Sequence, residues 1–272
     1  MTAAHVHLEV VAWLAAAAIL YAAGVRRARR RRPGAWPLRR SAAFAAGLVA
    51  AFVAVAAPLA SRAETLLSAH MLQHLLLTLV AAPLVVIGSP VSLALQATRD
   101  RARERLARVV RSRAVRLLTH PLVAWTAFAA TTVATHLTGF YELALRSGAM
   151  HAVEHALYVA TALLFWLPVL GTNPVRRLHG WLGRTLYLLL AMVPMSAVSA
   201  ALVYAAQPRY PSYAAAAREL GISALHDQQV AGAYMWVFGS LLMVSATFAV
   251  GWQALIREER RQRALDALEA GT

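Results

Sequence analysis

Apolar stretches of about twenty residues recur along the whole chain and constrain its fold more than any other feature. A helix of about 20 residues rises about 30 Å, which is the thickness of the hydrocarbon core of a bilayer. The chain is 60% hydrophobic, with a mean hydropathy of +0.54, as expected for a polytopic membrane protein. We therefore expect an all-α fold in one membrane domain, residues 1–272, with seven transmembrane helices at about 6–25, 41–60, 69–88, 120–138, 150–170, 184–206 and 228–254.

The positions of the basic residues predict how these helices cross the membrane. All 27 basic residues are Arg, and all but four of them lie in alternate loops or in the C-terminal tail. Cytoplasmic loops carry the excess of Arg and Lys in membrane proteins. The sequence therefore predicts an outer N-terminus and a cytoplasmic C-terminus, with the Arg-rich cytoplasmic segments at 26–40, 99–116, 176–184 and 257–263.

The net charge of +15 comes mostly from these Arg-rich segments. Their placement indicates attraction to anionic lipids at the cytoplasmic face rather than nucleic-acid binding. In the stretch "RDRARERLARVVRSRAVRLL", apolar residues recur near helical spacing. We expect an amphipathic helix on the inner interface there, between the third and fourth spans. The chain has no Cys, so disulfides and thiolate metal sites are excluded.

Histidines gather at the predicted outer ends of four spans. Residues four apart share one face of a helix, so the pairs in "HMLQH" and "HAVEH" each present two imidazoles on one edge. Single histidines at the outer ends of the fourth and seventh spans lie at the same depth. The sequence thus directs six imidazoles to one layer near the outer surface: His70, His74, His151, His155, His136 and His226.

These residue types predict a metal site. Imidazole suits copper, zinc, iron and nickel, and the thioethers of Met71 and Met150 beside the paired histidines favour Cu(I). Glu154 is a candidate ligand, an orienting carboxylate, a proton acceptor, or a side chain that reaches back to the surface. Asp227 is a further candidate ligand or a cap for the start of the seventh span. Each histidine alone also fits an inter-helix hydrogen bond.

Two other kinds of site use the same residues. "HAVEH" matches the H-x-x-E-H pattern of zinc peptidases, in which Glu154 would be the general base. A b-type haem or quinone electron carrier would use one imidazole from each of two facing helices, such as His70 and His155. The inner halves of the spans lack a comparable polar series, which favours a site at the outer face over a path across the membrane.

Three segments resemble the multi-span CtaG family of bacterial cytochrome c oxidase assembly proteins. They are "HMLQHLLLTLVAAPLVVIGSP", "MHAVEHALYVATALLFWLPVLG" and "DQQVAGAYMWVFGSLLMV", and the resemblance extends from about the second span to the seventh. The family's motif positions correspond here to His70, His74, His151, His155, Asp227 and Gln228.

The resemblance implies a non-enzymatic factor of the bacterial plasma membrane that is needed to make active haem–copper oxidase through copper delivery. Its expected partners are one or more oxidase subunits and an extracytoplasmic copper donor. The expected cargo is Cu(I), held at the outer face, with no catalytic residue. Zinc and haem are the alternatives that the residues leave open.

Overall fold

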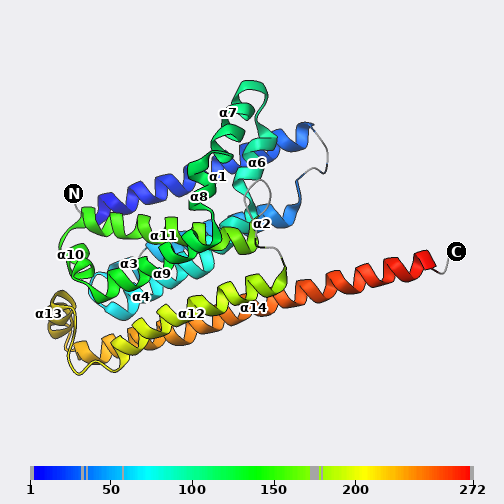
Figure 1. Ribbon diagram of the computed structural model, residues 1–272. Helices are drawn as coiled ribbons and strands as arrows, with labels where there is room; N and C mark the ends of the chain where they lie inside the picture. The colour runs from blue at the N-terminus through cyan, green and yellow to red at the C-terminus, as the bar shows by residue number, and fades with distance from the viewer. Residues whose placement is uncertain are drawn as a thin grey trace.

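The computed structural model describes residues 3–31, 34, 36–56, 58–171, 178 and 180–269, with side chains from residue 10 onward. Every element in this part of the chain is helical (Figure 1). The helices are α1 (Ala3–Arg31), α2 (Leu38–Val55), α3 (Leu59–Ala63), α4 (Leu67–Leu75), the π-helical turn η1 (Leu76–Ala81), α5 (Ala82–Gly88), α6 (Pro90–Ala97), α7 (Asp100–Val110), α8 (Arg113–Leu118), α9 (Pro121–Leu137), α10 (Phe140–Arg146), α11 (Gly148–Leu170), α12 (Trp181–Val203), α13 (Pro211–Glu219) and α14 (Ala224–Glu269).

Six helical segments in the described residues are long and apolar enough to cross a membrane, at Val10–Arg31, Leu38–Val55, Leu67–Ala97, Gly148–Leu170, Trp181–Val203 and Ala224–Glu269. These correspond to six of the seven predicted spans. The remaining one, at 120–138, coincides with α9, which has 17 residues and a length of about 25 Å. Because α9 packs against α11 and α12, it belongs to the same bundle. The seventh crossing and the orientation in the membrane stay predictions.

The histidine-bearing and arginine-bearing ends of the helices lie apart. The starts of α4 and α11 lie near α10 and α13, whereas the Arg-rich ends of α1 and α14 point the other way (Figure 1). This separation agrees with the alternation of charge along the sequence. Three basic residues in that pattern, Arg32, Arg176 and Arg177, lie outside the described residues.

The third span is one helical rod with a π-helical turn in its middle. Pro83 follows this turn, and a proline removes a backbone donor and crowds the carbonyl four residues earlier. Two bonds bind carbonyls near the turn: the Thr78 hydroxyl donates to the His74 carbonyl at 2.6 Å, and Trp166 Nε1 of α11 donates to the Thr78 carbonyl at 2.9 Å. The second bond fastens the histidine-bearing rod to α11.

The predicted interfacial helix is two short helices, α7 and α8, rather than one. The break lies at Arg111 and Ser112, and the Ser112 hydroxyl accepts from the Val115 N–H at 3.3 Å as the cap of α8. Val109 and Leu117 are exposed, in agreement with an apolar edge that meets lipid. Their position at the inner interface stays a prediction.

The largest apolar core joins the histidine-bearing rod to α11, α12 and α14. α12 and α14 lie close together at Gly232, where a methyl group would lie 2.9 Å from Leu202 Cβ and 3.0 Å from the Ser199 carbonyl oxygen. Only glycine permits this spacing, as at other close membrane-helix contacts. The approach places the start of α14 against the start of α4, next to the histidines.

Candidate metal centre

Two histidine pairs meet between α4 and α11. The ring centroids lie 4.4 Å apart within the His70–His74 pair and 4.3 Å apart within the His151–His155 pair. Across the two helices the centroids of His70 and His151 are 5.4 Å apart, as are those of His74 and His155. Each i, i+4 pair therefore presents two imidazoles on one helix face, as predicted. The histidine-bearing faces of α4 and α11 are turned toward one another.

Two overlapping groups of potential ligand atoms lie between these helices, and each group could hold a metal ion. One nitrogen each from His70, His74 and His155 falls within a 4.8 Å group, and so do atoms of His70, His151 and Glu154. His70 belongs to both groups. We call these five residues the His/Glu cluster.

Glu154 is the most informative member of the cluster. Its side chain is 0% exposed, and its two carboxylate oxygens lie 3.8 Å from His70 Nε2 and 3.9 Å from His74 Nε2. These distances are too long for hydrogen bonds, and neither oxygen has a hydrogen-bond partner in the described part of the chain. A buried carboxylate without a partner is costly. Its surroundings therefore suit a cation between the carboxylate and the imidazoles.

The donor set fits a transition-metal ion. Imidazole nitrogens and carboxylate oxygens bind such ions at about 2.0–2.2 Å, so two ligands of one ion lie at most about 4.3 Å apart. The distances from Glu154 to His70 and His74 satisfy this limit. Imidazole suits copper, zinc, iron and nickel. Several roles for Glu154 were open from the sequence, and these distances favour that of a candidate ligand.

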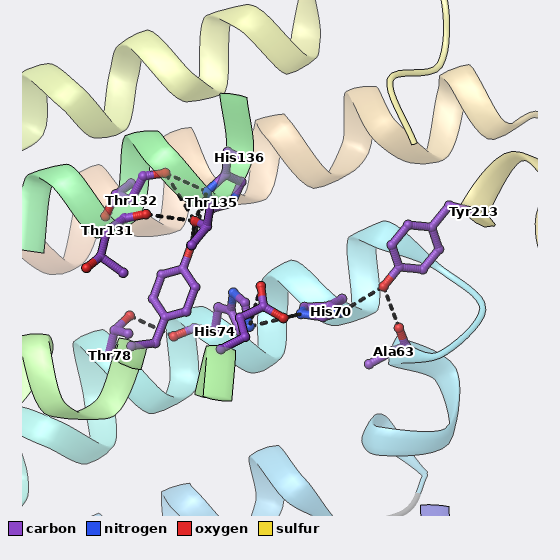
Figure 2. Close-up of polar contacts among 11 residues, drawn as sticks. Ala63, His70, His74, Thr78, Thr131, Thr132, Thr135, His136 and Tyr213 are labelled. Atoms are coloured by element: carbon purple, nitrogen blue, oxygen red, sulfur yellow. Dashed lines mark hydrogen bonds and ion pairs between the residues drawn. The ribbon is translucent and has the colours of Figure 1, made fainter. Parts of the chain in front are cut away.

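The tautomer of His70 follows from its neighbour Tyr213. The Tyr213 hydroxyl lies 2.6 Å from the Ala63 carbonyl oxygen and 2.8 Å from His70 Nδ1 (Figure 2). A carbonyl only accepts, so the hydroxyl proton is used there, and the hydroxyl oxygen accepts from His70 Nδ1–H. Neutral His70 therefore presents the lone pair of Nε2 to the cluster. Outer hydrogen bonds orient metal-binding histidines in this way.

His74 Nε2 lies 2.9 Å from His70 Nε2 (Figure 2). Since Nε2 of His70 bears a lone pair, we infer that Nε2 of His74 carries the proton and donates it. An ion bound to both nitrogens would displace this proton, so that binding is coupled to proton movement. His70 and His74 are 1% and 3% exposed, which keeps both rings away from bulk solvent.

Asp227 contacts the N-terminus of α4 rather than the cluster. One carboxylate oxygen accepts from the Leu67 N–H at 2.7 Å, and the carboxylate also accepts from the backbone and hydroxyl of Ser68. These are unpaired donors in the first turn of a helix, where an anion is favoured. Asp227 therefore caps the helix that carries His70, from α14. From the sequence, Asp227 was a candidate ligand or a cap for its own helix. In the structure it caps α4 instead.

His136 lies next to the cluster without joining either ligand group. Its Nδ1 is 2.8 Å from the Thr132 carbonyl oxygen, which makes Nδ1 the protonated nitrogen (Figure 2). Its Nε2 is buried without a hydrogen-bond partner among the described residues. The Tyr141 ring is near both residues, with its centroid 5.5 Å from that of His136 and 5.0 Å from that of His70.

The three remaining sequence candidates differ in their surroundings. His226 is exposed at the start of α14. Met71 is 1% exposed and packs in the apolar core, because the residue after His70 points about 100° around the helix. Met150 is half-buried in the first turn of α11. Among the described residues, His226 belongs to neither ligand group. The contribution of the Met71 and Met150 thioethers stays a prediction.

Sequence reasoning missed the tyrosines that surround the cluster: Tyr141, Tyr158, Tyr210 and Tyr213. Tyr158 Oη lies 3.1 Å from His136 Nδ1, and the Tyr210 hydroxyl donates to the His136 carbonyl at 2.9 Å. The Tyr141 hydroxyl is buried and has no hydrogen-bond partner among the described residues. The motif "YPSY" at 210–213, polar and aromatic between two spans, is a signal from which two of these tyrosines could have been predicted.

A hydrogen-bonded link between α10 and α13 holds Tyr213 in place. Glu142 accepts from the Ser212 hydroxyl at 2.6 Å and pairs with Arg146 at 2.8 Å. Burial raises the pKa of Glu142, but the Ser212 donors and Arg146 outweigh it and lower the pKa below its ordinary value of 4.5. The ionised form of Glu142 therefore fixes the residue that precedes Tyr213.

A cleft of about 640 Å³ reaches the cluster from the side of α1 and α2. His70, His151 and His155 lie on its wall, and most of its other lining residues are apolar, including Leu14, Val55, Leu77 and Val159. The cleft gives an apolar approach to the buried imidazoles from between the helices.

Comparison with known proteins settles the family. A family model described as cytochrome c oxidase caa3 assembly factor (Caa3_CtaG) matches residues 19–257. The chain belongs to this family. The match covers α2 to α13, the C-terminal part of α1 and most of α14, so it includes the whole His/Glu cluster and confirms the resemblance found in the three segments.

Relatives of this Caa3_CtaG chain occur in mycobacteria. Uncharacterized proteins of Mycobacterium bovis and Mycobacterium tuberculosis are each 28% identical over 255 residues, which are 90% of this chain and 38% of theirs. An uncharacterized protein of Mycobacterium leprae is 27% identical over 184 residues, 65% of this chain and 28% of its own. The chain thus spans less than half the length of these relatives. No solved structure matches it.

Proposed function

We propose that this protein holds a copper ion in the His/Glu cluster and delivers it to a subunit of a haem–copper cytochrome c oxidase. The family is an assembly factor for that oxidase, which makes the oxidase the partner. The observation that carries the copper step is the buried Glu154 carboxylate, which faces two imidazole nitrogens at 3.8 and 3.9 Å without a hydrogen bond in the described chain.

The cluster would serve as a carrier site rather than a catalytic one. Tyr213 orients the lone pair of His70 toward the ion, and Glu154 would neutralise part of its charge. Imidazole ligands accept Cu(I), and the carboxylate adds a hard donor that also suits Cu(II). No step needs a nucleophile or a general base. The geometry favours this role over a zinc peptidase, in which Glu154 would be the general base, because Glu154 is itself one of the candidate ligands.

The apolar cleft supports transfer from the side. Its walls suit an apolar segment of a partner between α1, α2 and α11, next to His151 and His155. An oxidase subunit is itself a membrane protein, so a lateral approach brings its copper ligands to the cluster without passage through bulk water. An extracytoplasmic copper donor would load the same cluster.

A transfer assay tests this function. The detergent-purified protein is loaded with one equivalent of Cu(I), mixed with the copper-free oxidase subunit, separated, and both are assayed for copper. We expect copper on the oxidase subunit after mixing with the wild type, and little after mixing with a Glu154→Gln protein. His226→Ala is the matched control, because His226 is exposed and outside the cluster. Retention of copper by a loaded wild type, or equal transfer by Glu154→Gln, would contradict the proposal.

A further inference from the structure

A second cavity lies between α1 and α2, lined by residues from their Arg-rich ends. It has a volume of about 640 Å³. Its lining runs from apolar residues of both helices, such as Ala18 and Leu48, to three arginines at the end of α1. None of its lining residues lines the cleft that reaches the His/Glu cluster.

Ring stacking and hydrogen bonds position the apolar wall of this groove. The rings of Tyr21 and Phe44 stack with centroids 3.8 Å apart and planes 7° from parallel. The Tyr21 hydroxyl donates to the Gly88 carbonyl at 2.8 Å and accepts from Trp36 Nε1 at 3.1 Å. The Tyr21 hydroxyl and Trp36 Nε1 thus have hydrogen-bond partners. The side of the wall that faces the groove offers mainly hydrocarbon and ring surface.

The basic end of the groove carries positive charge that the described protein does not neutralise. Arg26, Arg29 and Arg30 are exposed, and none of them forms an ion pair with an acidic side chain in the described residues. Arg29 donates weakly to the Trp36 carbonyl at 3.5 Å. Guanidinium groups on one helix edge match phosphate oxygens, which they bind in bidentate fashion.

The order of these features along the groove matches one kind of ligand. Ala18 and Arg30 are separated by about 18 Å along α1, with the apolar lining at one end and the arginines at the other. The outer surfaces of both helices are apolar, as Leu20 and Val49 show, so lipid chains surround this part of the molecule. A phospholipid has the same sequence of hydrocarbon and then phosphate.

We propose that the α1–α2 groove is a binding site for one anionic phospholipid, with an acyl chain along Tyr21 and Phe44 and the phosphate on Arg26, Arg29 and Arg30. The site is independent of the copper proposal. It differs from diffuse attraction of a basic surface to anionic lipid, because it requires both the arginines and an open groove.

Native mass spectrometry tests the site with phosphatidylglycerol as the probe and phosphatidylcholine of the same chains for comparison. One variant removes the charge, Arg26→Gln with Arg29→Gln and Arg30→Gln. A second keeps the charge and fills the groove, Ala22→Phe with Ala45→Phe, two exposed lining residues. The matched control removes three exposed arginines of α7 outside the groove, Arg101→Gln with Arg105→Gln and Arg108→Gln. Gel filtration and thermal unfolding show that each protein is folded.

We expect the wild type and the α7 control to retain one phosphatidylglycerol, and both groove variants to lose it at least tenfold. Phosphatidylcholine should bind at least tenfold more weakly to the wild type, and glycerophosphate should not displace the lipid. Equal loss in the α7 control, or retention by the filled groove, would show diffuse attraction and overturn the site. Displacement by glycerophosphate would point to a soluble phosphate ligand and would also overturn it.

Discussion

The hydroxyl of Tyr213 lies 2.8 Å from Nδ1 of His70, and this contact decides which nitrogen of His70 faces the cluster. Because the same hydroxyl donates to the Ala63 carbonyl, it accepts only from a protonated Nδ1. A residue of the short helix α13 thus prepares a candidate ligand on α4, although 143 positions separate them in the sequence.

Tyr213→Phe should weaken copper binding while the fold is retained. The change removes the acceptor for His70 Nδ1–H, and loss of such outer partners typically costs about 10–100-fold in metal affinity. Competition titration with a colorimetric Cu(I) chelator measures the change. Tyr204→Phe is the control, since Tyr204 is 76% exposed. An unchanged affinity in Tyr213→Phe would remove the positioning role.

Asp227→Ala should destabilise the protein by about 1–2 kcal/mol, the usual cost of losing a helix N-cap. The buried Leu67 N–H loses its 2.7 Å acceptor, so the first turn of α4 should fray. Thermal unfolding in detergent measures the loss, with exposed Asp266→Ala as the control. If the two variants unfold alike, Asp227 does not support α4.

The link between Glu142 and Ser212 should make α13 sensitive to acid. The folded-state pKa of Glu142 lies below its ordinary value of 4.5, so the ionised form stabilises the fold fully above pH 4.5. This contribution is lost as the pH falls from 4.5 through the lowered pKa. The protection factors of the α13 amides, which are corrected for the intrinsic slowing of exchange in acid, should therefore fall over that range in the wild type. Glu142→Gln should show low protection at every pH, and a loss of protection in acid as large as that of the wild type would contradict the assignment.

Gly232→Leu should destabilise the packing of α12 against α14. A methyl group at this position already lies 2.9 Å from Leu202 Cβ, and overpacking of a filled contact costs about 1–3 kcal/mol. Gly251→Leu is the control, because no atom lies within 4 Å of a methyl group there. Thermal unfolding of the two variants compares them, and equal midpoints would show that the close approach is not needed.

Local spacing was sufficient to predict the histidine pairs and most of the helices. Residues His70 and His74 share a face because of helix geometry alone, and hydropathy located the long helices. The same geometry explains the position of Met71, which is adjacent to His70 in sequence but packs in the apolar core. Its contribution as a thioether ligand stays a prediction.

The rest depends on tertiary contacts that no local pattern encodes. Asp227 was predicted at a helix start, yet it caps α4 across 160 positions because Gly232 brings α14 close to α12 and the start of α4. Tyr213 of α13 contacts His70, and the preceding residue, Ser212, is hydrogen-bonded to Glu142 of α10. The role of Glu154 followed only from its distances to two rings.

The affinity and stoichiometry of Cu(I) binding test the central claim most directly. The wild type, Glu154→Gln and His226→Ala are titrated anaerobically against a colorimetric competitor, with absorption spectra to detect haem and elemental analysis to detect zinc. We predict tight stoichiometric Cu(I) binding by the wild type and by His226→Ala, and at least tenfold weaker binding by Glu154→Gln. A folded wild type that binds no Cu(I), or a Glu154→Gln protein that binds it equally well, would contradict the account.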